Sequence, residues 1–202
     1  MEELKLIRNI ICIDLKSFFA SCECVERNLN PFTTPLVVAE PNRDGAITLA
    51  VTPYMKKLGV KSRGRIFEIP KNIDYKVVRP RMSLYIEKSK EVVDVYLDYV
   101  SEEDLHIYSI DECFLDVTNY LKLYNKTTKE LALDIMKSIY KKTHLYATAG
   151  IGPNLLLAKI SMDIEAKNNK DFIAEWTYDD IETKLWNITP LSKMWGIGTR
   201  ME

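Results

Sequence analysis

Acidic side chains at two distant points of the chain are the residues best suited to do chemistry. Asp111 and Glu112 are adjacent and interrupt an apolar run, and Asp14 lies near the end of another apolar run far earlier in the chain. Carboxylate oxygens are hard ligands that suit Mg²⁺ or Mn²⁺ and not zinc. Two such ions can activate an attacking oxygen and stabilise a leaving oxygen in phosphoryl or nucleotidyl transfer. The alternatives are a solvated hairpin tip for the acidic pair and a helix N-cap for Asp14.

The strands that carry these acids must lie side by side if the carboxylates are to meet. Residues 6–15 predict a strand covered on both faces, because they are almost continuously apolar. Residues 105–110 and 113–117 predict two strands that flank the acidic pair. Neighbouring side chains of a strand point to opposite faces, so Asp111 and Glu112 can serve one site only at a turn or a strand end.

The remaining pattern predicts an α+β fold. Helices are expected over 17–27, 53–58, 81–100, 126–142, 154–167 and 178–186, and further strands over 36–39, 46–51, 66–69, 75–78, 146–151 and 171–176. The expected buried stripe of the longest helix consists of Leu84, Val92, Tyr96 and either Tyr99 or Val100. Without residues 30–78, which predict an insertion with its own small core, the order of elements is that of a ferredoxin-like or split βαβ sheet.

Composition sets limits on the partners and the compartment. The 202 residues are 47% hydrophobic and 28% charged, and the net charge of −1 excludes a global positive field that would attract nucleic acid. The four cysteines do not have metal-site spacing and are expected to be buried free thiols in a reducing compartment. There is no apolar run near the roughly 20 residues of a membrane span and no signal pattern, so we expect a cytoplasmic protein.

Four motifs, in the same order along the chain, resemble those of the Y-family translesion DNA polymerases, and their sequences are most similar to the UmuC-like branch. The first two are IDLKSFFASCE at residues 13–23 and YSIDECFLD at residues 108–116. The third combines AGIGPN at residues 149–154 with LAKI at residues 157–160, and MWGIG at residues 194–198 is similar to the start of the family's helix-hairpin-helix thumb. The resemblance covers almost the whole chain in the family's order.

The resemblance implies a two-metal site and a nucleotide site. Asp14, Asp111 and Glu112 match the palm carboxylates that hold two Mg²⁺ ions, with Mn²⁺ as a possible substitute, and the backbone carbonyl of Leu15 matches an additional ligand. Phe19 matches the steric gate, the aromatic residue that closes against the sugar 2′ position. The nucleotide-binding positions are Phe18, Phe19, Lys56 and Lys167.

Some of these residues have other interpretations. Taken without the family, Phe19 is an ordinary core aromatic and each lysine a surface residue. The ring of Phe18 better suits the core, and Lys159 could either join the triphosphate site or cover the sheet. Many relatives carry a tyrosine where Pro53 stands, and Tyr54 or Thr52 would have to replace it.

The resemblance also implies the domain organisation and the partners. Residues 1–29 and 79–176 are expected to form the palm, residues 30–78 the fingers, and residues 177–202 the beginning of a thumb that stops short, whether by design or by natural truncation. The expected activity is template-directed addition of deoxynucleotides to primer–template DNA in the DNA damage (SOS) response. A sliding clamp would bind through segments absent here. We expect the 202 residues alone to fold, to bind Mg²⁺–nucleotide weakly and to polymerise poorly or not at all.

Two other function classes remain open. A nucleotide cyclase also places acids at a strand end and a hairpin, but it would be expected to show a Gly-rich acidic hairpin, which Ser109–Glu112 is not. A shortened, non-catalytic homologue that binds DNA or a partner is the second alternative, and the presence of all three acids argues against it.

Overall fold

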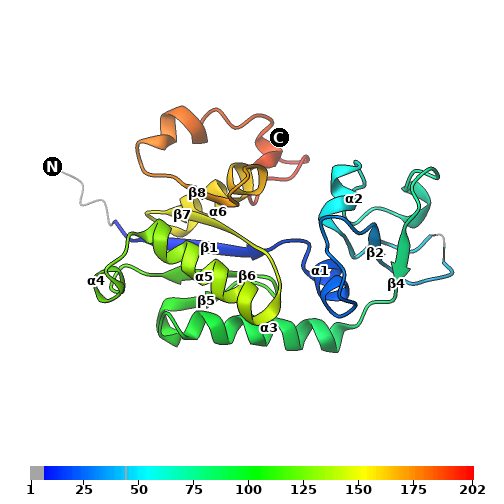
Figure 1. Ribbon diagram of the computed structural model, residues 1–202. Helices are drawn as coiled ribbons and strands as arrows, with labels where there is room; N and C mark the ends of the chain where they lie inside the picture. The colour runs from blue at the N-terminus through cyan, green and yellow to red at the C-terminus, as the bar shows by residue number, and fades with distance from the viewer. Residues whose placement is uncertain (1–6, 44) are drawn as a thin grey trace. The chain divides into compact units, whose positions relative to one another are not determined.

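The computed structural model describes residues 7–43 and 45–202, so Leu6 of the first predicted strand and Asp44 of the predicted insertion lie outside it. The chain forms two compact units (Figure 1). The first unit holds the chain up to Asp14 together with residues 93–142 and 147–202. The second unit holds residues 15–92 and 143–146.

A five-stranded sheet organises the first unit. Its strand order is β5 (Leu105–Ile107), β6 (Glu112–Asp116), β1 (Ile10–Leu15), β7 (Ala147–Gly152) and β8 (Ile173–Glu175). β6 runs antiparallel to both β1 and β5, whereas β7 and β8 are parallel. The first four strands have the order of a ferredoxin-like sheet, with β1 in the centre, so the predicted fold class is confirmed.

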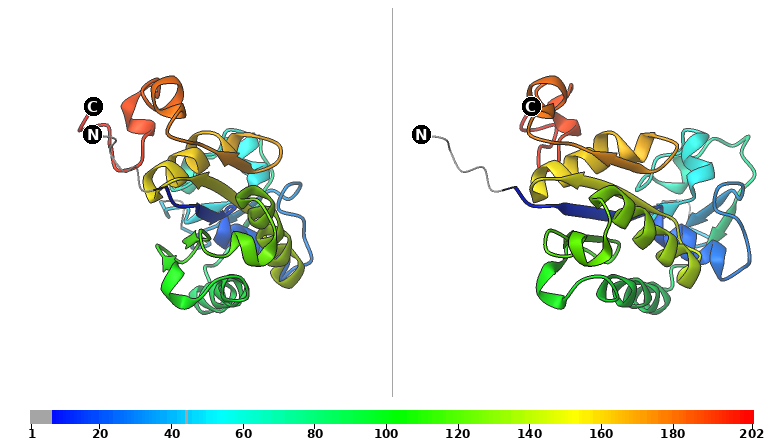
Figure 2. Two further views of the ribbon diagram at one scale, coloured as in Figure 1. Left: turned by 90° about the vertical axis from the view of Figure 1, so that its left-hand side faces the viewer. Right: turned by 60° about the vertical axis from the view of Figure 1, so that its left-hand side comes forward.

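The two faces of this sheet carry different residues. Ile10, Cys12 and Phe114 point to one face and form a buried cluster with α6 (Leu155–Ile164). Ile11 and Ile13 alternate with them and are also fully buried, so they point to the opposite face. On that side Figure 2 shows α5 (Thr128–Thr143), and Tyr99, just after the end of α3 (Met82–Leu97), is hydrogen-bonded to Ser138 of α5 at 2.7 Å.

The second unit is built on a three-stranded sheet in the order β3 (Ala50–Val51), β2 (Leu36–Val38), β4 (Lys76–Val78). Its helices are α1 (Phe18–Val25), α2 (Pro53–Lys57) and the first part of α3. The small core expected for residues 30–78 is present; its buried members are Val37, Ala39, Val51, Met55, Val60 and Ile69. Contacts group residues 15–29 and 79–92 with this core, while the division into palm, fingers and thumb stays a prediction.

Two strands predicted in the second unit were wrong in part. Residues 66–69 contain a 3₁₀ turn, η1 (Ile66–Glu68), because the Glu68 carboxylate accepts the backbone N–H of Arg65 at 2.7 Å and closes the turn. The strand predicted for residues 46–51 is reduced to β3, and Ile47 makes only an isolated bridge to Arg65. Local side-chain bonds of this kind compete with strand pairing.

The C-terminal region also departs from the predicted helices. The helix predicted for residues 154–167 divides into α6 and a 3₁₀ turn, η3 (Ala166–Asn168), and the one predicted for 178–186 is the π-helical turn η4 (Ile181–Leu185). Three short elements were not predicted: η2 (Glu102–Asp104), α4 (Leu121–Tyr124) and η5 (Leu191–Lys193). All four cysteines are free and buried, as expected. Over residues 7–43 and 45–202, no helix combines the length and the apolar character needed to cross a membrane.

Candidate active site

Asp14 and Glu112 lie opposite each other where β1 and β6 pair. They are cross-strand partners in the antiparallel register, in which Cys12 pairs with Phe114. Cross-strand partners point to the same face of a sheet, and this face is the one covered by α6. The strand that opens the fold therefore delivers its carboxylate beside that of the acidic pair, as the sequence predicted.

A tight corner before β6 makes it possible for two consecutive acids to act together. The backbone carbonyl oxygen of Glu112 accepts the N–H groups of both Tyr108 and Ser109, each at 3.0 Å. The Ser109 hydroxyl donates to the Asp111 carboxylate at 2.8 Å and accepts the Asp111 N–H at 3.4 Å. Asp111 thus lies in the bend and Glu112 begins the strand, so the strict alternation of a strand does not separate them.

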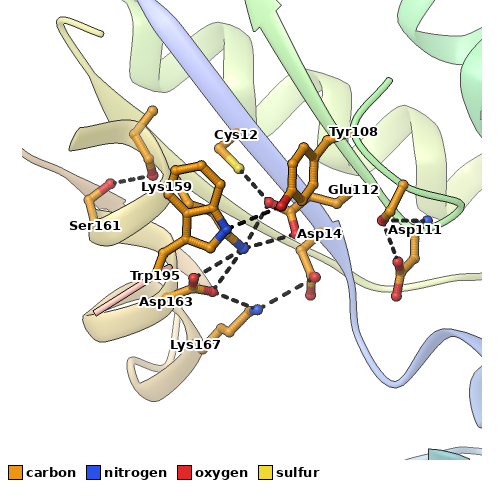
Figure 3. Close-up of polar contacts among 12 residues, drawn as sticks. Cys12, Asp14, Tyr108, Asp111, Glu112, Lys159, Ser161, Asp163, Lys167 and Trp195 are labelled. Carbon is orange, nitrogen blue, oxygen red and sulfur yellow. Dashed lines mark hydrogen bonds and ion pairs between the residues drawn. The ribbon is translucent and has the colours of Figure 1, made fainter. Parts of the chain in front are cut away.

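A ladder of charges on α6 and η3 faces these acids (Figure 3). Lys159, Asp163 and Lys167 are spaced by four residues and therefore line one side of a helical path. The ammonium group of Lys159 lies 2.8 Å from Glu112 and 3.0 Å from Asp163. That of Lys167 lies 2.8 Å from Asp163 and 3.5 Å from Asp14. Lys159 and Glu112 are only 5% and 7% exposed, so each needs the other as a partner.

Two glycines of β7 let α6 approach the sheet closely enough for this contact. A Cβ atom at Gly150 would lie 2.2 Å from the carbonyl oxygen of Ala158, and one at Gly152 would lie 2.4 Å from the Ala158 nitrogen. Both obstacles are backbone atoms next to Lys159, and backbone atoms cannot rotate away. The glycines therefore set the distance between the helix that carries Lys159 and the sheet that carries Glu112.

Burial and neighbouring charge shift the pKa values of these groups. Burial raises the pKa of Asp14 to about 6; the Lys167 ammonium opposes this shift, and the carboxylates of Asp111 and Glu112 add to it. Burial alone would lower the pKa of Lys159, but its bonds to Glu112 and Asp163 raise it overall, so Lys159 stays a cation. Asp14, Asp111 and Glu112 therefore sense one another electrostatically.

The donor types at this corner suit a hard divalent cation, but the acids are held by lysines here. Over residues 7–43 and 45–202, no three His, Cys, Asp or Glu side chains are grouped closely enough to hold a metal ion. Glu112 and Asp14 instead meet the ammonium groups of Lys159 and Lys167. The carboxylate oxygens of Asp14, Asp111 and Glu112 match the ligand preference of Mg²⁺. A cation bound to Glu112 would neutralise the negative charge of its carboxylate in place of the Lys159 ammonium group.

The other predicted nucleotide-site residues belong to the second unit, apart from Lys167. On α1, Phe18 is buried in the core and Phe19 is half-buried. Leu15 ends β1 directly after Asp14, and Lys56 is exposed in the last turn of α2. The structure describes each of these positions, and their roles towards a nucleotide stay predictions.

Thr52 is occupied by a structural role. Its hydroxyl donates to the Thr34 carbonyl at 2.8 Å and accepts the N–H groups of Leu36 and Met55, so it caps α2. Tyr54 is half-buried on the same helix, and whether it replaces the tyrosine that relatives carry at the position of Pro53 stays a prediction.

Sequence reasoning missed several residues around the acids. Asp163 joins the two lysines, and its spacing of four residues from each is a signal that the sequence contains. Ser109 orients Asp111, which no spacing rule shows. Trp195, in the segment predicted to begin a thumb, donates its indole N–H to the Tyr108 hydroxyl at 3.2 Å beside the acidic corner (Figure 3).

A ferredoxin-like sheet with acids at the end of its first strand and at a hairpin corner is an arrangement that polymerase palms share with nucleotide cyclases, so comparison with known families decides between these classes. The family described as impB/mucB/samB matches residues 13–163 of this chain. The chain therefore belongs to that family, that of the Y-family DNA polymerases, which confirms the resemblance seen in the motifs.

Curated relatives and solved structures agree with this assignment. The chain is 44% identical over 197 residues to the putative UV-damage repair protein UvrX of Bacillus subtilis, and 37% identical over 195 residues to DNA polymerase IV 2 of the same organism. The insertion ternary complex of Dbh DNA polymerase superposes with a TM-score of 0.79 at 26% identity over 95% of this chain.

The chain spans about half the length of the relatives that it matches. It covers 46% of UvrX and 46% of DNA polymerase IV 2, while 96% of this chain is aligned with each. In the Dbh ternary complex it covers 55% of the polymerase chain.

Proposed function

We propose that this chain carries the nucleotidyl-transfer centre of a translesion DNA polymerase that adds deoxynucleotides to the 3′ end of a primer. The observation that carries the proposal is the register of β1 and β6, which sets Asp14 opposite Glu112 on one face of the palm sheet, next to Asp111. Membership of the Y family and the similarity to DNA polymerase IV 2 support it.

The chain's own residues divide the work as follows. Asp14, Asp111, Glu112 and the backbone carbonyl of Leu15 would hold two Mg²⁺ ions. When bound, such ions lower the pKa of the primer hydroxyl and neutralise charge on the phosphates. Ser109 fixes the direction of Asp111, and Lys159 keeps Glu112 neutralised and ordered until an ion binds. Lys167 and Lys56 would supply cations for the triphosphate, and Phe19 would exclude the 2′-hydroxyl of a ribonucleotide.

The wider setting follows from the family. The proposed substrates are a deoxynucleoside triphosphate and primer–template DNA, and the proposed role is DNA repair synthesis during an SOS response in the cytoplasm. The net charge of −1 implies that much of the affinity for the DNA backbone comes from contacts outside these residues, such as the further length present in the relatives or a sliding clamp.

A primer-extension experiment tests the function. The chain is joined to the C-terminal half of DNA polymerase IV 2 of Bacillus subtilis and incubated with a labelled primer–template, Mg²⁺ and deoxynucleotides. We expect Mg²⁺-dependent addition of nucleotides, and a loss of at least about 10³-fold in Asp111→Asn, because an amide cannot replace a charged metal ligand.

Asp116→Asn is the matched control, since Asp116 lies on the same face of β6, four residues from Glu112, and pairs with Arg8 instead. It makes the same change of charge at the other end of the strand and is expected to retain activity. Equal activity in the wild type and Asp111→Asn, or equal losses in the two variants, would contradict the assignment.

A further inference from the structure

Phe19 rests on a second aromatic ring that the family motifs do not include. The rings of Phe19 and Tyr85 are stacked, with centroids 4.5 Å apart and an angle of 18° between their planes. Tyr85 is fully buried near the start of α3, whereas Phe19 is half-buried on α1. One face of the Phe19 ring is therefore held by Tyr85 while part of its surface stays accessible.

A buried carboxylate fixes Tyr85 in turn. The Tyr85 hydroxyl donates to Glu23 at 2.7 Å, and Glu23 is fully buried. Arg81 donates to both oxygens of Glu23, from Nε at 3.0 Å and from Nη2 at 2.8 Å, and Arg27 makes a third ion-paired contact. Although burial raises the pKa of Glu23, its bonds to Arg81, Tyr85 and Arg27 lower it overall, so the carboxylate is charged.

The spacing on both helices makes this arrangement a single unit. Phe19 and Glu23 are four residues apart on α1, and Arg81 and Tyr85 are four residues apart at the beginning of α3. Each pair therefore presents two adjacent side chains on one face of its helix. Tyr85 contacts both members of the α1 pair, with its ring on Phe19 and its hydroxyl on Glu23, so the plane of the Tyr85 ring is set from two sides.

A buried charge of this kind adds little stability compared with apolar residues of the same size, because desolvation offsets the attraction. What it adds is a fixed geometry. A phenylalanine at position 85 could rotate or slide against Phe19, whereas a tyrosine bonded to Glu23 cannot do so without breaking a charge-assisted hydrogen bond. All of these residues lie within the second unit.

We propose that Tyr85, anchored by Glu23 and Arg81, is a positioning residue that fixes the ring of Phe19 and so sets discrimination between deoxyribose and ribose. This inference rests on the proposed function, in which Phe19 contacts the sugar. Tyr85 is fully buried and would act through Phe19, on which its ring is stacked; its ring also meets the edge of Phe18, with centroids 6.5 Å apart.

The test measures the affinity of the 202-residue chain for Mg²⁺–dCTP and Mg²⁺–CTP by calorimetry. The wild type is expected to favour dCTP, and Phe19→Ala to lose that preference. Tyr85→Leu is expected to reduce the preference by about tenfold, equivalent to about 1.4 kcal/mol, while the affinity for dCTP changes less. Tyr85→Phe, which keeps the ring and loses the bond to Glu23, is expected to give an intermediate ratio.

Tyr96→Leu provides the matched control. Tyr96 lies on the same helix and is 1% exposed, so its loss leaves a cavity of similar size. The ring of Phe19 contacts the rings of Phe18 and Tyr85, and Tyr96 is not one of these partners. Tyr96→Leu is therefore expected to lower the free energy of unfolding but to keep the wild-type ratio of affinities. Thermal unfolding of each variant verifies that it is folded before binding is measured.

The outcomes separate the two proposals. A wild type that binds neither nucleotide, or binds both equally, contradicts the proposed function. A wild type that prefers dCTP, with the preference lost in Phe19→Ala but kept in Tyr85→Leu, overturns the role of Tyr85 alone. A wild-type ratio in Tyr85→Phe would overturn the role of the Glu23 anchor, and an equal loss in Tyr96→Leu would show a general effect of destabilisation.

Discussion

At the scale of single residues, the surroundings of Asp14 disfavour the charged form of its carboxyl group. Its pKa is raised from 3.8 to about 6 by burial, with neighbouring carboxylates adding to the shift and Lys167 opposing it. A group that binds its proton more tightly in the folded state than in the unfolded state stabilises the fold only while it is protonated. Asp14 therefore lowers stability as the pH rises from about 4 to about 6, a cost that fits the cation-binding role proposed for it.

The substitution Asp14→Asn tests whether burying the charge of Asp14 lowers the stability of the fold. The amide has no charge to bury, so the free energy of unfolding of the variant should rise relative to wild type between pH 4 and pH 7.5, by up to about 3 kcal/mol. Urea unfolding of both proteins at the two pH values gives this difference. A difference that is independent of pH, or that shrinks as the pH rises, would show that Asp14 is not desolvated as described.

The residues that the sequence predicted and those that it missed differ in a physical way. Asp14, Asp111 and Glu112 interrupt apolar strands. A charge in an apolar strand is costly to bury unless it is paired or binds a cation, so these three residues can be recognised from the sequence. Tyr85 and Glu23 gave no such signal, because a tyrosine and a glutamate on amphipathic helices are ordinary. The predicted stripe of α3 contained Leu84, yet it is the neighbouring Tyr85 that is fully buried, together with Val92 and Tyr96. An error of one residue in the predicted buried stripe is within the tolerance of a helical pattern, but it changes which side chain contacts Phe19.

At the scale of elements, the contact of α6 with β7 decides where the lysines reach. Gly150→Ala would place a methyl group 2.2 Å from the Ala158 carbonyl oxygen and 2.5 Å from the Met162 Cβ atom, so the helix would have to move away from the sheet. We expect a loss of about 1–3 kcal/mol or more in the free energy of unfolding, measured in urea. The same displacement would lengthen the contact of Lys159 with Glu112.

Gly198→Ala is the control for this prediction, because a Cβ atom there would meet nothing within 4 Å. It is expected to change the free energy of unfolding by less than about 0.5 kcal/mol. Equal effects of the two substitutions would mean that α6 is not held by close approach at Gly150, and that the glycines of the motif serve another purpose.

The long elements were predictable and the short ones were not. β1, α3 and α5 have enough residues for their hydrophobic period to outweigh local effects, and each is found where the pattern placed it. The segment at residues 66–69 has the composition of a strand but turns as η1, because Glu68 caps its own turn. The order of the strands in the sheet depends on contacts distant in sequence, and it could be predicted only by assuming a known topology.

At the scale of the whole molecule, charge and length bear on function together. A net charge of −1 leaves no overall attraction to a nucleic acid, so a nucleic acid would have to be held by local groups. At the acidic corner of the five-stranded sheet, Asp14 and Glu112 lie opposite each other and are paired with Lys167 and Lys159, and Asp163 joins the two lysines, so charges of both signs are concentrated there. The carboxylates of this corner suit metal ions and its lysines suit phosphates, so the corner is better suited to the two bound together than to either alone.

The most direct test of the account is a crystal structure of the chain grown with Mn²⁺ and a deoxynucleoside triphosphate, with anomalous scattering used to locate the metal. We expect a manganese peak in contact with Asp14 and with Asp111 or Glu112, and Lys159 displaced from Glu112. An ordered nucleotide with no manganese at these carboxylates, and with both lysines still paired to Glu112 and Asp14, would contradict it.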